Sequence, residues 1–339
     1  MMSDNDQTDR AQLVRRLAMA AGFERVGIAT AGPVNRGDYY KGWLDRGCAG
    51  EMHYLHRHLD VRVDPRKLLD GARSIIVVAQ NYRHDSCSQS GIAEASTSEP
   101  VSDARSSTTA EPVRGRIAQY AWGRDYHRVL KKRLRGLADA LHEAIGEPFE
   151  TRVCVDTAPI VEREWAAVAG IGWIGKNTVV LDRQLGSFFF LGEIVTTLEL
   201  EPSEPATDYC GSCTRCLEAC PTGALSAPYQ MDASRCIAYL TIEHRGDIPE
   251  SLQVLMGNWV FGCDVCQEVC PYNRHAPVTQ EPAYALHKRH PLPPRPQLDE
   301  LPAWTEQGYR RNLAGSAIKR ATLEMLKRNA DIAGRNADR

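Results

Sequence analysis

Cysteine is the residue type whose placement points most directly to chemistry in this chain. Eleven cysteines occur among 339 residues, and three of them, Cys48, Cys87 and Cys154, are scattered before residue 200. The other eight fall in one stretch: Cys210, Cys213, Cys216, Cys220, Cys236, Cys263, Cys266 and Cys270. Thiolate sulfur binds both zinc and iron–sulfur clusters. The sequence therefore predicts a separate metal-binding module over residues 201–280.

The spacing of these cysteines favours iron–sulfur clusters over zinc. Two runs, C-x₂-C-x₂-C-x₃-C-P from residue 210 and C-x₂-C-x₃-C-P from residue 263, match the bacterial two-cluster ferredoxin pattern, in which the last cysteine of each run ligates the other cluster. Two-residue gaps let successive thiolates wrap one cubane, and the proline interrupts the local backbone hydrogen bonding. We predict one 4Fe–4S cluster on Cys210, Cys213, Cys216 and Cys270, and a second on Cys220, Cys236, Cys263 and Cys266. Zinc is the alternative occupant.

A two-cluster module carries single electrons, so the rest of the chain must hold their acceptor. The spacing G-x-G-x-x-G at residues 170–175 follows a predicted helix rather than a strand, so it indicates a loop with unusual backbone angles, not a dinucleotide site. The cobalt-ligating pattern D-x-H-x-x-G is nearly matched by Asp125 and His127, but residue 130 is leucine. We expect a structural or surface role for His127, and no bond from it to cobalt.

Composition bounds the remaining possibilities. The chain is long enough for two to three domains at roughly 150 residues each. Its 43% hydrophobic and 25% charged residues exclude fibrous and wholly disordered classes. The net charge of −2 means that any nucleic-acid contact must come from a local basic patch. No apolar run approaches the ~20 residues of a membrane helix, and the polar N-terminus does not resemble a signal peptide. We expect a cytoplasmic protein with reduced thiols and no membrane partner.

Periodicity predicts the elements that would position these groups. Helices are expected at 8–21 and 125–145, and strands at 25–29, 73–82 and 151–155, the last ending at Asp156. Pro159 should open a helix to about residue 169, and 177–181 with 187–198 should form a hairpin. Further helices are expected at 298–304 and 316–329. The Ser/Thr/Ala/Glu-rich segment 85–112 reads as a disordered surface insertion.

Four motifs in order resemble the epoxyqueuosine reductase family: YAWGRDYH at 120–127, DTAPIVER at 156–163, GWIGKN at 172–177 and YLTIEHRG at 239–246. The similarity runs from about residue 13 to residue 329. The resemblance implies an α+β fold. A nitroreductase-like cobalamin-binding domain would span 8–200, a two-cluster ferredoxin-like domain 201–280, and a helical, tRNA-contacting segment 281–339.

The resemblance also implies a reaction and its cofactors. Members reduce the epoxide of epoxyqueuosine at the tRNA wobble position to queuosine, using two 4Fe–4S clusters and base-off cobalamin. Asp156 matches the family's proton donor, and we expect burial or neighbouring negative charge to raise its pKa. Arg163 is expected to orient the substrate or Asp156. The electron donor would be a flavodoxin, a ferredoxin or a chemical reductant, and we expect a monomer.

Other contacts are assigned by residue type. Arg62 and Lys176 are candidates for the phosphate and amide groups of cobalamin, and Leu240 and His244 for a bridge between cluster and corrin. Ordinary solvated charges are the alternative for the first two. Residues 281–339 hold 11 Lys/Arg and 7 Asp/Glu, so this segment is basic, and it predicts tRNA contacts with a steep salt dependence. The candidates are Arg310, Arg311, Lys319, Arg320, Lys327 and Arg328.

Two other functions remain open from the sequence. A cobalamin-dependent reductase of a small molecule, such as a dehalogenase, would share the same chemistry, although the basic C-terminal segment disfavours it. A ferredoxin-like electron-transfer subunit would carry clusters and no corrin. Cobalt and corrin absorbance in the purified protein would exclude the second alternative.

Overall fold

A four-stranded antiparallel sheet forms the centre of the N-terminal half. The computed structural model describes residues 4–85, 113–285 and 292–337. The strands lie in the order β1 (Arg25–Thr30), β2 (Ser74–Asn81), β7 (Phe189–Thr196) and β4 (Thr151–Cys154). Every residue of β2 is buried, and Ile76 pairs with Ile28 on one side and Ile194 on the other. The antiparallel sheet with separate helices agrees with the expected α+β class.

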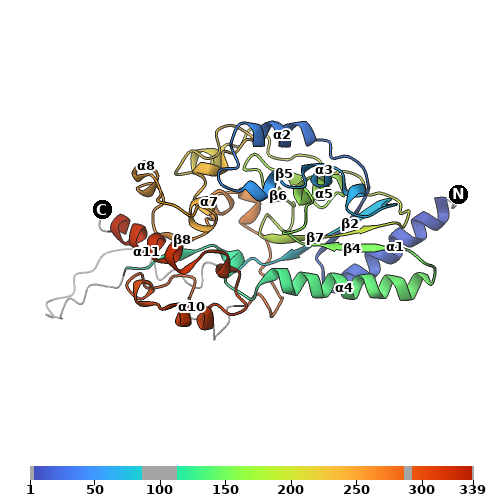
Figure 1. Ribbon diagram of the computed structural model, residues 1–339. Helices are drawn as coiled ribbons and strands as arrows, with labels where there is room; N and C mark the ends of the chain where they lie inside the picture. The colour runs from blue at the N-terminus through green and yellow to red at the C-terminus, as the bar shows by residue number, and fades with distance from the viewer. Residues whose placement is uncertain (1–3, 86–112, 286–291, 338–339) are drawn as a thin grey trace, which may run out of the picture.

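Helices cover both faces of this sheet (Figure 1). On one face lie α1 (Asp4–Ala20) and α4 (Tyr126–Ile145), whose buried stripe of Leu130, Leu134, Leu137 and Leu141 packs on the strands. The other face carries α5 (Glu162–Val168), while α2 (Gly37–Asp45) and α3 (Leu59–Arg62) lie on the same side in Figure 1. The apolar spacing on α4 therefore predicted both the helix and its buried face.

The cysteine-rich module and the C-terminal segment pack together. The module contains α6 (Arg215–Glu218), α7 (Ile237–Ile242), α8 (Glu250–Gln253), β8 (Trp259–Phe261) and α9 (Val265–Glu268). The C-terminal segment contains α10 (Glu306–Asn312) and α11 (Leu323–Ala337). One hydrophobic cluster joins Ile117, Val260 and Leu326. Strand β3 (Arg116–Ile117) pairs in parallel with β8. The N-terminal half is thereby joined to both later parts.

Four predicted elements differ from the structure. The helix expected at 298–304 is only a short 3₁₀ turn, Leu301–Ala303. The segments 177–181 and 187–198 do not form a hairpin: β6 (Val180–Leu181) pairs with β5 (Trp173–Ile174), while β7 joins the main sheet, where it is paired on both sides. The helix expected from Pro159 begins at Glu162, because Asp156 has a φ of +48° and turns the chain first. The helix expected at 316–329 starts at Leu323 and extends to Ala337. Of the predicted insertion at 85–112, residues 86–112 lie outside the described part of the chain.

The loop at 170–175 confirms the expectation of unusual backbone angles. Gly170 has a φ of +75°, and a Cβ there would lie 2.4 Å from the carbonyl oxygen of Glu204. A Cβ on Gly172 would lie 2.2 Å from the carbonyl oxygen of Leu181. Glycine is needed here for close backbone packing. Separately, no helix in the described ranges combines the length and the hydrophobicity that a membrane span requires.

Candidate active site and metal centres

The eight cysteine side chains fall into two groups of four. The thiol of Cys270 lies close enough to interact electrostatically with Cys210, Cys216 and Cys213, although Cys270 belongs to the later run. The thiols of Cys263 and Cys266 likewise interact with Cys236 and Cys220. Burial, followed by neighbouring sulfur, raises the pKa of Cys270, Cys263 and Cys266. The first quartet is therefore Cys210, Cys213, Cys216 and Cys270, and the second is Cys220, Cys236, Cys263 and Cys266.

The first quartet surrounds a cavity of about 220 Å³ lined by all four of its cysteines. The indole N–H of Trp173 donates to the sulfur of Cys210 at 3.4 Å. Such donors stabilise the negative charge of a thiolate that ligates a cluster. The donor set and the space fit an iron–sulfur cluster. Among the described residues, no three His, Cys, Asp or Glu side chains lie close enough together to share a single metal ion.

Lys176 was predicted to contact cobalamin, but its ammonium group is bound within the protein. Its ammonium group donates to the carbonyl oxygens of Gly211 at 2.6 Å and Cys213 at 3.0 Å. These hydrogen bonds tie the loop after β5 to the loop of the first quartet. The prediction is corrected for a physical reason: two backbone carbonyls already engage the charge of Lys176.

Asp156 lies in the loop between β4 and α5. Its φ of +48° is in the left-handed region, which aspartate tolerates better than most residues. Its backbone N–H donates to a carboxylate oxygen of Glu162, and its carboxylate accepts from the hydroxyl of Tyr126 at 3.0 Å. Its side chain is 50% exposed. The carboxylate of Asp156 is thus partly exposed to solvent, and Tyr126 of α4 binds it from the protein side.

His127 bridges two carboxylates at this site. Its Nε2 lies 2.7 Å from the carboxylate of Asp156, and its Nδ1 lies 2.7 Å from that of Asp125, the N-cap of α4. Despite burial, these two hydrogen bonds and charges raise the pKa of His127 to about 9. The ring is therefore an imidazolium near neutral pH and donates from both nitrogens. The ring of His127 thus contacts the candidate acid, in addition to the structural role that the sequence predicted for it.

The expected rise in the pKa of Asp156 is wrong in direction. Burial acts to raise this pKa, but the hydrogen bond and charge of His127, the hydroxyl of Tyr126 and the charge of Arg320 outweigh it and lower it. The raised pKa values belong to its neighbours. Burial and the charge of Asp156 raise the pKa of Glu162 to about 8. Near neutral pH the protons of this site therefore sit on His127 and Glu162.

Glu193 adds a further carboxyl group beneath the loop. It lies on β7, is fully buried, and neither of its carboxyl oxygens has a hydrogen-bond partner. Burial, reinforced by Glu162 and Asp156, raises its pKa well above the ordinary value. A buried carboxyl without a partner is costly unless it is neutral. Glu193 is therefore protonated near neutral pH, and it adds a further proton to this site.

The His127 bridge predicts a pH-dependent contribution to stability. The pKa of His127 is raised from 6.5 to about 9 in the folded protein, so the stabilisation is complete below pH 6.5 and is lost as the pH rises through about 9. We expect His127→Gln to lower the urea midpoint most at pH 6 and much less at pH 10. His142→Gln, on the same helix, is the control and should show no such trend. A gap between wild type and His127→Gln that is the same at both pH values would contradict this.

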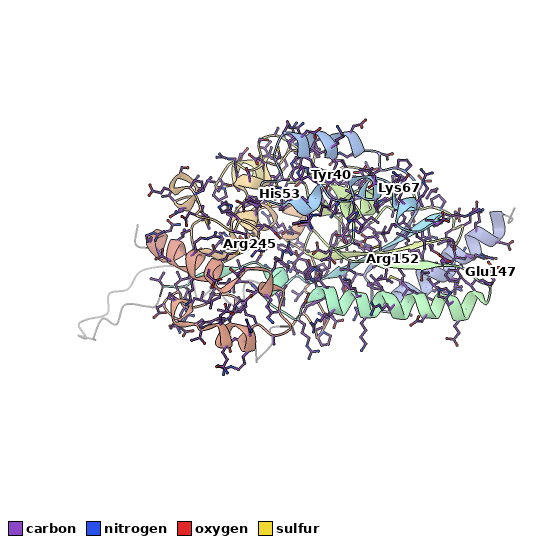
Figure 2. The ribbon with its side chains drawn as sticks, viewed as in Figure 1. Tyr40, His53, Lys67, Glu147, Arg152 and Arg245 are labelled. Carbon is purple, nitrogen blue, oxygen red and sulfur yellow. The ribbon has the colours of Figure 1, made fainter. Side chains whose placement is uncertain are left out.

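Arg163 and Arg62 lie together beside Tyr40, which Figure 2 labels on α2. Burial raises the pKa of Tyr40, and the charges of Arg62 and Arg163 oppose the rise. Arg163 donates to the carbonyl oxygen of Thr178 at 2.6 Å rather than to Asp156, one of its two expected partners. A contact of Arg163 with the substrate, the other expectation, stays a prediction. The Nε of Arg62 is buried and has no hydrogen-bond partner. An unpartnered guanidinium nitrogen fits a bound ligand with phosphate or amide oxygens.

Leu240 and His244 are engaged within the protein. Leu240 is 1% exposed and packs in an apolar cluster with Ile237 and Trp259, which corrects its predicted contact with a cofactor. His244 lies 2.9 Å from the carbonyl oxygen of Asp247 through Nε2 and 3.3 Å from Glu51 through Nδ1. Both residues therefore pack or form hydrogen bonds around α7.

The predicted tRNA-contacting residues separate into two kinds. Arg328 is half-buried against α7 and donates to the carbonyl oxygens of Leu240, His244 and Gly246, so its predicted contact with tRNA is corrected. Arg320 forms a two-pronged ion pair with Glu243, with both N–O distances 2.9 Å. The side chains of Arg310, Arg311 and Lys319 are exposed, and that of Lys327 is half-buried. Four of the six residues thus remain candidates for an RNA surface.

The C-terminal basic segment reaches the candidate acid. The backbone N–H of Asp125 donates to the carbonyl oxygen of Gly315 at 2.8 Å. Arg320 lies near enough to Asp156 for its charge to lower that pKa. The exposed Lys319 is its chain neighbour, so basic residues border the site where Asp156 is presented.

Sequence reasoning missed Tyr126, Glu162 and Glu193. Tyr126 and Glu162 lie inside two of the motifs quoted above, but neither motif says which side chains point at Asp156. Glu193 carried a usable signal: it is a charged residue in the middle of the apolar strand 189–196. A charge at such a position is uncommon without a function or a partner.

Comparison with known proteins agrees with these features. A family model described as "Epoxyqueuosine reductase QueG, DUF1730" matches residues 62–157, and one described as "4Fe-4S double cluster binding domain" matches residues 209–273. The epoxyqueuosine reductase of Xanthomonas campestris pv. campestris is 41% identical over 332 residues, which cover 98% of this chain and 88% of that protein.

Two solved structures extend the likeness to the whole fold. A crystal structure of epoxyqueuosine reductase with an epoxyqueuosine-modified tRNA-Tyr stem loop has a TM-score of 0.82 and 30% identity, and covers 96% of this chain and 82% of that one. The Bacillus subtilis epoxyqueuosine reductase, in a structure with an aspartate catalytic loop swung out of the active site, has a TM-score of 0.81, 30% identity and the same coverage. With this identity over nearly its full length, the chain belongs to the epoxyqueuosine reductase family of oxidoreductases.

Proposed function

We propose that this protein reduces the epoxide of epoxyqueuosine in tRNA to the alkene of queuosine. Two 4Fe–4S clusters would deliver the electrons, and cobalamin in its base-off form would receive them. The observation that carries the proposal is the site around Asp156, where His127 and Glu162 hold protons near neutral pH. This site borders a basic segment, and the same chain groups eight thiols in two quartets. A relative bound to an epoxyqueuosine-modified stem loop supports the choice of substrate.

The two quartets suggest a direction for the electrons. The second quartet lies nearer the acid: Cys236 and Cys263 pack against the same hydrophobic cluster as Tyr120, whose ring centroid is 6.1 Å from that of Tyr126. Tyr126 in turn donates to Asp156. The first quartet borders a hollow in the protein surface. Electrons would therefore enter at the first cluster and leave the second toward Asp156.

Cobalamin, when bound, supplies an electron-accepting cobalt centre that can act on the substrate. Arg62, with its unpartnered Nε, and Arg163 would hold its polar groups on the α5 side of the sheet. His127 and Leu130 do not complete a cobalt-ligating motif, and both ring nitrogens of His127 are already engaged by carboxylates.

This chain's own residues would supply the protons. Removal of the epoxide oxygen as water consumes two electrons and two protons. The imidazolium of His127 can pass a proton from Nε2 to the carboxylate of Asp156, which would deliver it to the substrate oxygen. Glu162, with a pKa of about 8, holds a second proton near neutral pH. General acids positioned in this way typically contribute 10²–10⁴-fold to the rate.

The exposed C-terminal charges should bind the tRNA backbone. We expect Arg311→Glu combined with Lys319→Glu to weaken binding of the stem loop about tenfold or more at low salt and to flatten the salt dependence, because the slope falls by about one unit for each phosphate that the protein no longer neutralises. Lys41→Glu, on α2 at the opposite side of Figure 1 from α10, is the matched control. Fluorescence anisotropy over a salt series measures both. Unchanged affinity and slope in the double variant would contradict this surface.

The proposal and its two alternatives are separated by one set of incubations. Protein reconstituted anaerobically with iron, sulfide and cobalamin should convert epoxyqueuosine tRNA, and omission of cobalamin should abolish conversion. Conversion of a halogenated phenol without conversion of tRNA would favour the small-molecule reductase. Retention of iron and sulfide with no uptake of cobalamin would favour an electron-transfer subunit.

A further inference from the structure

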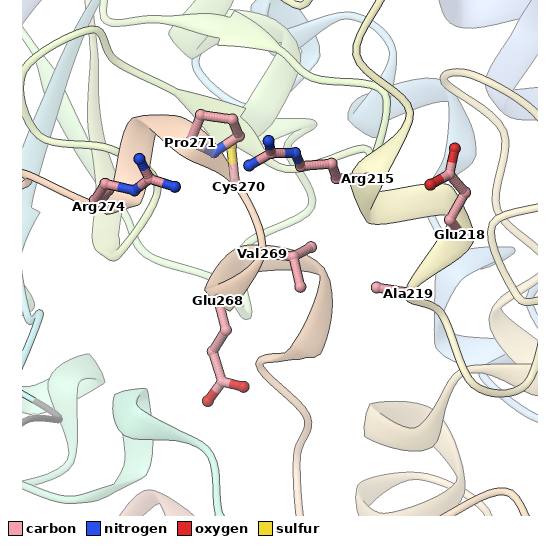
Figure 3. A pocket seen from close by; sticks show the side chains of 8 residues that line it. All are labelled: Arg215, Glu218, Ala219, Glu268, Val269, Cys270, Pro271 and Arg274. Carbon is pink, nitrogen blue, oxygen red and sulfur yellow. The ribbon is translucent and has the colours of Figure 1, made fainter. Parts of the chain in front are cut away.

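A surface hollow opens beside the first cysteine quartet. Its volume is about 580 Å³, and Cys270 lines it together with Arg215 and Glu218 of α6, Glu268 of α9, and Arg274. Figure 3 shows the two arginine side chains on either side of Cys270, with both carboxylates at the outer edges. A ligand of the first cluster is thus reached from the surface between two guanidinium groups.

The charge available in this hollow is positive. The carboxylate of Glu268 is paired with Arg116 at 2.5 Å, and the carboxylate of Glu218 accepts the hydroxyl of Thr214 at 2.5 Å. Arg215 and Arg274 are exposed, and neither forms an ion pair with any residue in the described ranges. Glu268 is therefore neutralised by Arg116, while Glu218 keeps its negative charge. The two arginines have no paired carboxylate, so the hollow keeps a net positive charge and both guanidinium groups can contact a partner.

An aromatic residue and a third arginine extend the same face. Tyr209, which precedes Cys210, is 44% exposed. The guanidinium of Arg183 lies 4.8 Å from the centre of its ring. Tyrosine and arginine are enriched at the centres of protein interfaces. The docking face is defined here as Arg183, Tyr209, Arg215 and Arg274.

We propose that this docking face binds a small redox protein with an acidic surface, which donates electrons one at a time to the first cluster. The inference rests on the proposed function, since it requires the first quartet to hold a cluster. Two donors, each oxidised by one electron, supply the pair of electrons that one epoxide consumes. Complexes of electron-transfer proteins are small and short-lived, and complementary charge sets their association rate.

The test is the rate at which reduced flavodoxin, an acidic one-electron carrier, reduces the holoenzyme under anaerobic stopped flow. We expect Arg215→Glu combined with Arg274→Glu to slow this step at least tenfold at low ionic strength, and the difference to shrink as salt is raised. Lys132→Glu combined with Arg135→Glu makes the same change of charge at two exposed residues of α4 and should leave the rate unchanged. Iron content is measured first, and Arg→Gln variants with a smaller expected effect replace any variant that loses iron.

A second reductant separates docking from an effect on the cluster itself. The reduced methyl viologen cation should reduce the variant at least as fast as wild type, because it needs no docking face and is attracted rather than repelled by glutamate. Equal slowing with flavodoxin and viologen would show that the arginines act on the cluster, and no slowing with either would place the donor elsewhere; both results overturn the proposal. Since no tRNA is present, failure of the proposed substrate would not affect the readout.

Discussion

Asp156→Asn is expected to lower turnover of epoxyqueuosine tRNA by about 10²–10⁴-fold while iron, sulfide and cobalamin content stay at wild-type levels. The amide can still accept the hydroxyl of Tyr126, but it cannot receive the proton of His127 and pass it on. The measurement is single-turnover conversion, with the affinity for the stem loop determined in parallel.

Asp125→Asn provides the graded control for this variant. It removes one of the two charges that raise the pKa of His127, so the alkaline limb of the pH–rate profile should move to lower pH with a smaller loss of rate. Together, Asp156→Asn and Asp125→Asn distinguish an acid from a structural residue, because a structural defect would not shift the pH–rate profile. Full activity of Asp156→Asn would remove this residue from the mechanism.

Cys270→Ala is expected to remove about half of the iron and to abolish turnover. The thiol of Cys270 lies with Cys210, Cys213 and Cys216, so the lost cluster should be the first one, although Cys270 follows Cys266 in the chain. The spectrum of the reduced variant should therefore match that of Cys216→Ala and differ from that of Cys266→Ala. Iron analysis and electron paramagnetic resonance measure this.

Cys48→Ala is the control for the cysteine series, since Cys48 lies outside both quartets, and it should retain all of its iron. Zinc in place of iron in the wild-type protein would refute the clusters themselves. A spectrum of Cys270→Ala that matches Cys266→Ala would instead show that each run holds its own cluster.

Sequence alone could predict the cysteine quartets because ligand spacing encodes the chemistry directly. It could also predict α4 and β2, whose apolar patterns match the faces they bury. The partnership of His127 with Asp156 was beyond its reach, because 29 residues separate them and only the packing of α4 beside β4 brings them together. The pKa of Asp156 was predicted with the wrong sign for the same reason: the cation that decides it belongs to another element.

Surface assignments failed where a long side chain turned inward. Arg328 is of a residue type that often contacts RNA, yet its guanidinium donates hydrogen bonds to three backbone carbonyls at the end of α7. Lys176 similarly binds two carbonyls of a cysteine loop. Backbone carbonyls at helix and loop ends need donors, and a sequence pattern does not show which arginine or lysine will supply them.

The nucleoside product of a single reaction tests the central proposal most directly. The reconstituted protein is incubated anaerobically with a reductant and tRNA carrying epoxyqueuosine, and the tRNA is then digested and analysed by mass spectrometry. We predict queuosine, lighter than the starting nucleoside by one oxygen atom, in amounts that rise with the enzyme. Unchanged epoxyqueuosine, from protein that has retained its iron and cobalt, would contradict the proposed function.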